Sequence, residues 1–154
     1  MSSKCTIYCE TDDPQRIIEL AGTKIDKGNI CTDSEIWKTL SIKTANSNIR
    51  FTRLIREVAG DSFCQLILST YNKFRIITTQ AVNEQKNLLE MISRCQLIIG
   101  VVVEPKFDET SNHYDLIFEI AKKLEGVILT KDGMINCNGK MIIDYEGNTE
   151  INLA

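Results

Sequence analysis

The sequence contains few histidines, tryptophans and prolines. It has one histidine, one tryptophan and two prolines in 154 residues. A cysteine nucleophile needs a neighbouring base, and His113 is the only imidazole that six thiols could share. A histidine pair for a metal ion is impossible for the same reason. The composition thus offers little support for a catalytic or metal-binding protein.

Close cysteine pairs and long apolar runs are also missing. The six cysteines are spread over the chain without a C-x-x-C motif, whereas zinc ligands usually come in such pairs. The N-terminus, MSSKCTIYCETDD, has no apolar segment typical of a secretory signal. The longest apolar run, LIIGVVV at 97–103, is too short to cross a bilayer. We therefore expect reduced thiols in a cytoplasmic protein with no cofactor and no membrane contact.

What remains is the composition of a globular protein. Hydrophobic residues make up 43% and charged residues 25% of the chain, with no repeat and no linker. We expect one globular domain over residues 1–154. The strings "TKDG" and "NCNGK" place glycine beside lysine but lack the spacing of a phosphate-binding loop, so they are interpreted as turns.

The N-terminal half alternates strands and helices in the predicted pattern. Residues 3–9 alternate as a strand does, and Asp12 and Asp13 before Pro14 predict a helix that ends at Gly22. Residues 36–44 predict another strand. For residues 48–59, the spacing of Phe51, Leu54, Ile55 and Val58 favours a helix. Residues from 61 onward fit a helix, although a strand at 65–69 is nearly as good.

The C-terminal half is easier to interpret. A helix at 83–94 would bury Leu88, Leu89 and Ile92, and residues 97–103 predict a central strand covered on both faces. A helix capped by Asn112 and ended by Gly126 follows, then a strand at 127–130, which favours a parallel crossover. Asn138-Gly139 predicts a two-residue hairpin. The expected fold class is α/β (α+β), a mixed sheet packed with helices, with a C-terminal β-α-β unit followed by a hairpin.

The segment "EPKFDETSNHYD" at 104–115 places the single histidine among four carboxylates. It is interpreted first as a connection from strand to helix, with His113 a neutral, half-buried capping residue. A partner-binding loop is the second interpretation. The third is a small hydrolase that uses Glu104, Asp108 and His113, with or without a metal ion.

Charge is distributed unevenly along the chain. Residues 36–83 carry seven basic and two acidic side chains, and residues 84–154 carry seven basic and twelve acidic ones. The basic segment includes a candidate basic patch at Arg50, Arg53 and Arg56. It could be a solvated or internally paired face, a protein or subunit contact, or a phosphate-binding surface. The acidic pI near 5.3 disfavours nucleic acid. Trp37 could be either a core residue or an interface anchor.

The acidic C-terminal half suggests contact with a protein. Tyr114 and Phe118 lie one helical turn apart among carboxylates, and the predicted contact residues are Asp108, Glu109, Tyr114, Asp115, Phe118 and Glu119. The alternative for Phe118 is the edge of the core. We expect a small non-catalytic protein that binds a basic partner through this acidic face, as bacterial immunity or antitoxin proteins do. The alternatives are the hydrolase and a self-associating structural protein.

Overall fold

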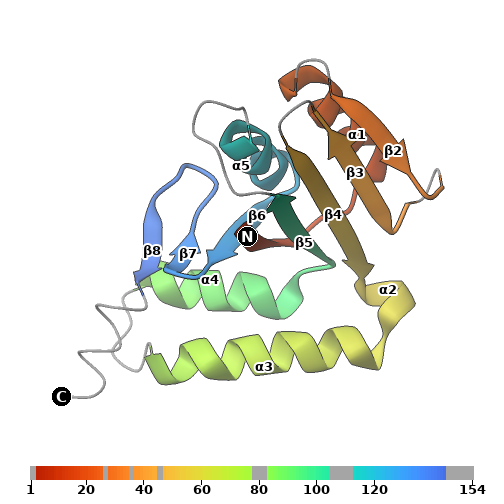
Figure 1. Cartoon of the computed structure of the whole chain (residues 1–154). Helices are drawn as coiled ribbons and strands as arrows, with labels where there is room; N and C mark the ends of the chain where they lie inside the picture. The colour runs from red at the N-terminus through yellow and green to blue at the C-terminus, as the bar shows by residue number, and fades with distance from the viewer. Residues whose placement is uncertain are drawn as a thin grey trace.

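The computed structural model describes residues 3–25, 28–34, 37–44, 47–77, 83–104 and 113–144 (Figure 1). Its strands and helices follow in the order β1 (Ser3–Cys9), α1 (Pro14–Lys24), β2 (Asn29–Thr32), β3 (Thr39–Lys43), β4 (Asn48–Ile55), α2 (Arg56–Ala59), α3 (Asp61–Ile77), α4 (Asn83–Arg94), β5 (Leu97–Glu104), α5 (His113–Lys123), β6 (Gly126–Thr130), β7 (Gly133–Ile135) and β8 (Met141–Asp144). The predicted α+β class is confirmed.

One sheet contains all the strands of the described residues, in the order β2-β3-β4-β5-β1-β6-β7-β8. Every pairing is antiparallel, so the sheet is not mixed in its hydrogen bonding. β5 lies at the centre, between β4 and β1, and pairs over its whole length with β4. This position suits its β-branched sequence, which has the apolar side chains that a central strand buries.

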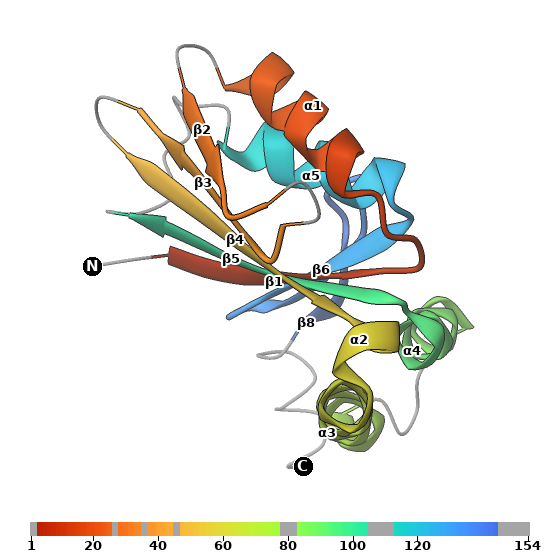
Figure 2. The ribbon, with the colours of Figure 1, turned by 90° about the vertical axis from the view of Figure 1, so that its right-hand side faces the viewer.

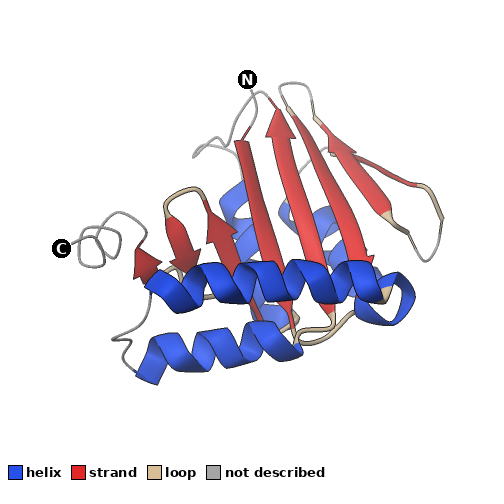
Figure 3. Cartoon of the chain, turned by 90° about the horizontal axis from the view of Figure 1, so that it is seen from below, coloured by secondary structure: helices blue, strands red, loops and turns tan. Residues whose placement is uncertain are grey.

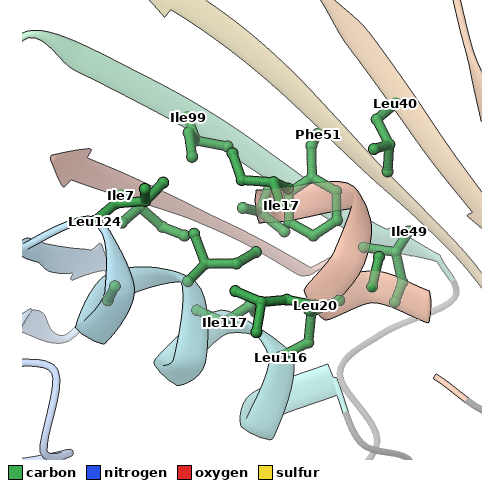
Figure 4. Close-up of a cluster of buried hydrophobic side chains, with 14 of the residues drawn as sticks. Ile7, Ile17, Leu20, Leu40, Ile49, Phe51, Ile99, Leu116, Ile117 and Leu124 are labelled. Atoms are coloured by element: carbon green, nitrogen blue, oxygen red, sulfur yellow. The ribbon is translucent and has the colours of Figure 1, made fainter. Parts of the chain in front are cut away.

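Helices cover both faces of the sheet (Figure 2). α1 and α5 pack on one face, where the core includes Ile17 and Leu20 of α1 and Leu116 and Ile117 of α5 (Figure 4). α3 and α4 pack on the other face, where Leu88, Leu89 and Ile92 of α4 are buried as predicted. No helix among the described residues is long and apolar enough to span a membrane.

The junction of β1 and α1 forms as its sequence predicts. The Asp13 carboxylate accepts a hydrogen bond from the backbone N–H of Arg16 at 3.0 Å, and Pro14 occupies the first helical position. The predicted end at Gly22 is wrong, because the helix continues to Lys24. Gly22 is exposed, and a helix interior tolerates glycine at a modest cost.

The largest correction concerns residues 48–55, which form the strand β4 and not a helix. Ile49, Phe51 and Arg53 point into the core, whereas Arg50 and Thr52 are exposed on the opposite face. An arginine at a buried position disguises the alternation that would have indicated a strand. The helix does follow from residue 61, as α3, with Phe63 and Ile67 buried.

The C-terminal unit has the predicted order of strand, helix and strand, with one change in pairing. β5 and β6 each run antiparallel to β1, which lies between them, so the two strands share a direction without being neighbours. α5 ends at Lys123, and the residue with the positive φ is Glu125, at 55°. Gly126 is the first residue of β6. A Cβ there would lie 2.8 Å from the Tyr8 carbonyl oxygen.

The final hairpin forms, but with a longer loop than predicted. The backbone N–H of Asn136 donates to the carbonyl of Lys140, and that of Gly139 donates to the carbonyl of Asn136. The Asn136 side chain accepts from the N–H groups of Asn138 and Lys140. Gly139 has a φ of 86°. This arrangement is a turn followed by a glycine bulge, in which glycine supplies only one of the positive φ angles that a two-residue loop would need.

Candidate functional site

The predicted site at residues 104–115 is only partly described. Asp108 and Glu109 lie outside the described residues. His113 is the first residue of α5, and its side chain is 1% exposed, so it is fully and not half buried. Its Nε2 lies 3.2 Å from the hydroxyl of Ser47, in the turn between β3 and β4. The imidazole thus links the start of α5 to that turn.

Glu104 and His113 are not brought together. Glu104 is the exposed last residue of β5, and Val103 beside it points into the core under α1 and α5. Because successive side chains of a strand point to opposite faces, Glu104 projects on the face away from α5. A buried imidazole and a carboxylate on opposite faces of a sheet do not make an acid–base pair.

The outer side of α5 carries the four predicted contact residues that the structure describes. Tyr114 is 40% exposed and Asp115 is exposed, whereas Phe118 and Glu119 are half-buried. Phe118 packs against the edge of the main core, as the alternative interpretation held. We call Tyr114, Asp115, Phe118 and Glu119 the acidic face of α5. Exposed Lys122 and Lys123 follow on the next turn, so the acidic character is limited to the first two turns.

The three arginines of the candidate basic patch have three different environments. The Arg53 side chain is 1% exposed, and its Nη1 lies 2.7 and 2.8 Å from the two carboxylate oxygens of Asp12. Its Nε donates to the Trp37 carbonyl, and its guanidinium lies over the Trp37 ring. Trp37 is itself fully buried, which excludes the interface-anchor interpretation. Arg53 therefore forms an internal ion pair with Asp12 and is not part of a surface.

Arg56 and Arg50 also lie apart from each other. Arg56 donates to the Ser93 carbonyl and stacks over Phe63, at the end of the sheet where α2 begins. Arg50 is exposed, five residues before β4 ends, on the face of the sheet that α3 and α4 cover in part. Of the three arginines of the predicted patch, Arg50 alone has its side chain exposed on the sheet. Its neighbours on that face are not Arg53 and Arg56.

Those neighbours form a surface that the sequence-based interpretation did not identify. α3 and α4 cross one end of the long strands and leave the other end bare (Figure 3). On β5, Gly100 and Val102 are half-exposed on this face. Thr52 and Thr6 flank Gly100 on either side, and Arg50 and Lys4 flank Val102. We call this surface the open half-face; its members are Lys4, Thr6, Thr39, Ser41, Lys43, Arg50, Thr52, Gly100 and Val102.

The open half-face is hydroxyl-rich and positively charged. Lys4, Lys43 and Arg50 are exposed, and within the described residues none of the three forms an ion pair. Glu104, in register with Asn48, places a carboxylate at its rim. A Cβ added at Gly100 would meet no atom within 4 Å, so the middle of the surface is open space. The alternation Arg50-Phe51-Thr52 in the sequence is the signal that could have indicated it.

The cysteines divide into buried and exposed thiols. Cys5, Cys9 and Cys95 are buried, Cys137 is half-buried, and Cys31 and Cys64 are exposed. Burial raises the pKa of Cys5 to about 12 and that of Cys95 to about 11, and it also raises the pKa of Cys9. A raised pKa disfavours the nucleophilic thiolate, so these three are core residues. Among the described residues, no group of three His, Cys, Asp or Glu side chains is placed to hold a metal ion.

Comparison with known proteins leaves the chain without a family assignment. No protein-family model, no curated protein and no solved structure matches it.

Proposed function

We propose that this protein acts without catalysis, by binding a basic partner protein through the acidic face of α5. The observation that carries the proposal is the exposure of Tyr114 and Asp115 on the first turn of a helix whose other side is anchored in the core. Tyr114 is 40% exposed, whereas Leu116 and Ile117 beside it are buried. A partner would therefore meet a rigid helix and not a loose segment.

The residue types on this face suit recognition of a protein. Tyrosine supplies a large contact area with little side-chain entropy to lose, and it is common at binding hot spots. Asp115 and Glu119 lie one helical turn apart and place two negative charges beside the ring. Carboxylates at the edge of such a contact steer a basic partner and raise the association rate.

The partner that fits best is a basic protein whose activity is blocked when its charged surface is covered. Bacterial immunity proteins neutralise their cognate toxins in this way, and that class is the concrete form of the proposal. The support is the acidic helix face and the net charge of −3. The hydrolase alternative is weaker, because the 1% exposure of His113 leaves its ring little access to a substrate.

The experiment is an affinity capture from native lysate with a set of matched baits. The test bait carries Asp115→Lys and Glu119→Lys, and a second carries Asp108→Lys and Glu109→Lys. The control bait carries Glu57→Lys and Glu90→Lys, two exposed carboxylates away from α5 that give the same change in net charge. Captured proteins are identified by mass spectrometry, and their affinity for the purified baits is then measured.

The expected result is one basic protein that binds the wild type and the control bait and whose affinity falls at least tenfold with the Asp115/Glu119 bait. The loss should be smaller at high salt, because added ions screen exposed charges. Equal binding to all the baits would contradict the proposal, since the contact would then lie elsewhere on the molecule.

A further inference from the structure

The molecule has two surfaces of opposite charge that cannot meet within one chain. The acidic face belongs to α5, which packs on one side of the sheet together with α1. The open half-face lies on the other side, on the part of the strands that α3 and α4 do not cross (Figures 2 and 3). The sheet separates them, so any contact between them must join two molecules.

The charge of the open half-face restricts what can cover it. A symmetric dimer through this surface would bring Lys4, Lys43 and Arg50 of two copies together, and like charges repel. A single-stranded nucleic acid normally stacks its bases on aromatic side chains, and the open half-face contains no aromatic residue. An acidic protein surface avoids both difficulties, because carboxylates pair with the cations and hydrogen-bond to the hydroxyls.

We propose that the open half-face receives the acidic face of α5 from a second copy of this chain. This inference rests on the proposed function, because it names a positively charged surface, on a second copy of the chain, as a partner of that same helix face. Arg50 and Lys4 would pair with Asp115 and Glu119, and the Tyr114 ring would lie over Gly100. The absence of a side chain at Gly100 leaves space for that ring.

The spacing of the charges is compatible with this docking. Arg50 and Lys4 both neighbour Val102, one on each side, so their backbones are two strand spacings or about 10 Å apart. Asp115 and Glu119 are one helical turn apart, about 6 Å between their Cβ atoms. The flexible stems of the arginine and the lysine can span the remaining difference.

The contact joins two different surfaces, so it is head-to-tail. A pair of molecules keeps one free surface of each kind, so further copies can add to form a chain or a ring. One helix on part of a sheet face buries less than the roughly 1,200 Å² typical of stable complexes, so the association is weak. It is to be measured at high protein concentration, about 0.3 mM, and at low ionic strength.

The test is a complementation between two charge-reversed variants, followed by sedimentation velocity. The first variant carries Lys4→Glu and Arg50→Glu, which destroys the open half-face but keeps α5 intact. The second carries Asp115→Lys and Glu119→Lys, which destroys the acidic face but keeps the open half-face. Wild-type protein should sediment faster as its concentration rises, and each variant alone should stay monomeric.

Mixing the two variants gives the decisive result. One intact surface of each kind remains, and the two reversed surfaces are again opposite in charge, so the mixture should associate although neither variant does alone, and the complexes should dissociate at about 0.5 M salt. The control variant, Lys86→Glu with Lys131→Glu, changes two exposed lysines outside both surfaces and should associate like the wild type. A Gly100→Gln variant fills the open space without adding charge and should be monomeric, which guards against misfolding of the charge variants.

Three outcomes would overturn the inference: a wild type that stays monomeric, a first variant that associates as the wild type does, or a mixture that stays monomeric. In any of these cases the capture experiment can still find a different protein that binds the wild-type bait and not the Asp115→Lys/Glu119→Lys bait. The proposed function would then stand, and only the contact between two copies would fail. Salt-sensitive binding of a labelled oligothymidylate that Arg50→Glu abolishes, with no self-association, would reassign the surface to nucleic acid.

Discussion

Arg53 brings a positive charge into the core, where its side chain is 1% exposed. The guanidinium is held by the Asp12 carboxylate, by the Trp37 carbonyl and by the face of the Trp37 ring. These contacts join β4 to the start of α1 and to the chain before β3. A charge so placed is tolerated only while its partners remain, because the desolvation of an unpaired ion is costly.

Loss of the Asp12 carboxylate should therefore be strongly destabilising. We expect Asp12→Ala to lower the free energy of unfolding by about 3 kcal/mol, the lower end of the range for a broken buried pair, since Asp12 is 24% exposed. Urea denaturation measures the loss. The matched control is Glu19→Ala, which breaks the exposed Arg16–Glu19 pair and should cost less than about 0.5 kcal/mol. Equal losses for the two variants would show that the buried pair is not special.

The buried thiols predict a loss of stability in alkaline solution. The pKa of Cys5 is raised to about 12 and that of Cys95 to about 11 from an ordinary value near 9, and the pKa of Cys9 is raised as well. Between pH 9 and the raised pKa of each thiol, the folded protein keeps protons that the unfolded chain releases. The free energy of unfolding therefore falls as the pH rises above 9. At pH 10 the loss is about 1.4 kcal/mol for each thiol.

The measurement is urea denaturation under reducing conditions at pH 7.5 and pH 10. Cys5→Ala should reduce the alkaline loss by one thiol's share, although it also lowers stability at both pH values. Cys31→Ala removes an exposed thiol and should leave the alkaline loss unchanged. If the Cys5→Ala variant shows the full wild-type loss, then ionisation of this thiol is not its cause.

For single residues, the sequence predicts the burial of apolar side chains well and that of polar side chains poorly. Leu88, Leu89 and Ile92 are buried as their helical spacing predicts. Arg53 and His113 are buried more deeply than expected, and their partners Asp12 and Ser47 lie 41 and 66 residues away along the chain. Local periodicity carries no information about a partner at that distance, so an internally paired arginine was one of the interpretations but its partner Asp12, like the partner Ser47 of His113, could not be identified.

The strands β7 and β8 depend on one glycine. Gly133 has a φ of 149°, and a Cβ there would overlap the carbonyl group of Ile143 on β8. We expect Gly133→Ala to cost roughly 2 kcal/mol or more, because the substitution adds backbone strain to a steric overlap. Gly100 on β5 is the matched control. A Cβ there meets nothing within 4 Å, so Gly100→Ala should be neutral or stabilise by about 0.5 kcal/mol.

Thermal denaturation of both variants tests this contrast. Near-equal melting temperatures would contradict the close approach of β7 and β8 at this position. An unchanged melting temperature of Gly100→Ala also matters for the open half-face, because substitutions there can probe binding only if the fold is maintained.

Whole elements were predictable where one residue type dominates. The apolar run of β5 and the Asp13 cap with Pro14 at the start of α1 are local signals, and β5 and the start of α1 lie where expected. β4 was predicted as a helix because Arg53 occupies an inward position and interrupts the alternation of Ile49 and Phe51. The open half-face escaped prediction for a different reason: it depends on how far α3 and α4 extend across the sheet, which is a property of tertiary packing.

Across the whole molecule, the two sides of the sheet are packed unequally. The core under α1 and α5 follows β1 and β5 from Cys5 to Cys9 and from Leu97 to Val103. On the other side, the core residues that the structure describes under α3 and α4 include only Tyr8 and Ile98 from these two strands. Among the α3 side chains that the structure describes, Phe63, Ile67 and Thr70 are buried. The described part of α3 is therefore held to the sheet by few buried side chains.

One buried hydrogen bond ties α3 to the sheet. The Tyr8 hydroxyl lies 3.1 Å from the Thr70 hydroxyl, and both residues are buried. Burial also raises the pKa of Tyr8, so the phenol stays protonated and able to donate well above neutral pH. Segments with few buried contacts open before the rest of a protein does. We expect backbone amides of α3 to exchange with deuterium sooner than those of β1, β4 and β5.

Tyr8→Phe makes this prediction specific. It removes one hydroxyl and leaves that of Thr70 buried without its partner, so α3 should open more easily by about 1–2 kcal/mol. Hydrogen exchange read by mass spectrometry should show faster exchange in α3 and little change in β5. The double variant Tyr8→Phe/Thr70→Val removes both polar groups and should recover part of the protection. A uniform increase across α3 and the sheet would mean that the molecule opens as one unit, and the bond would then stabilise the entire fold.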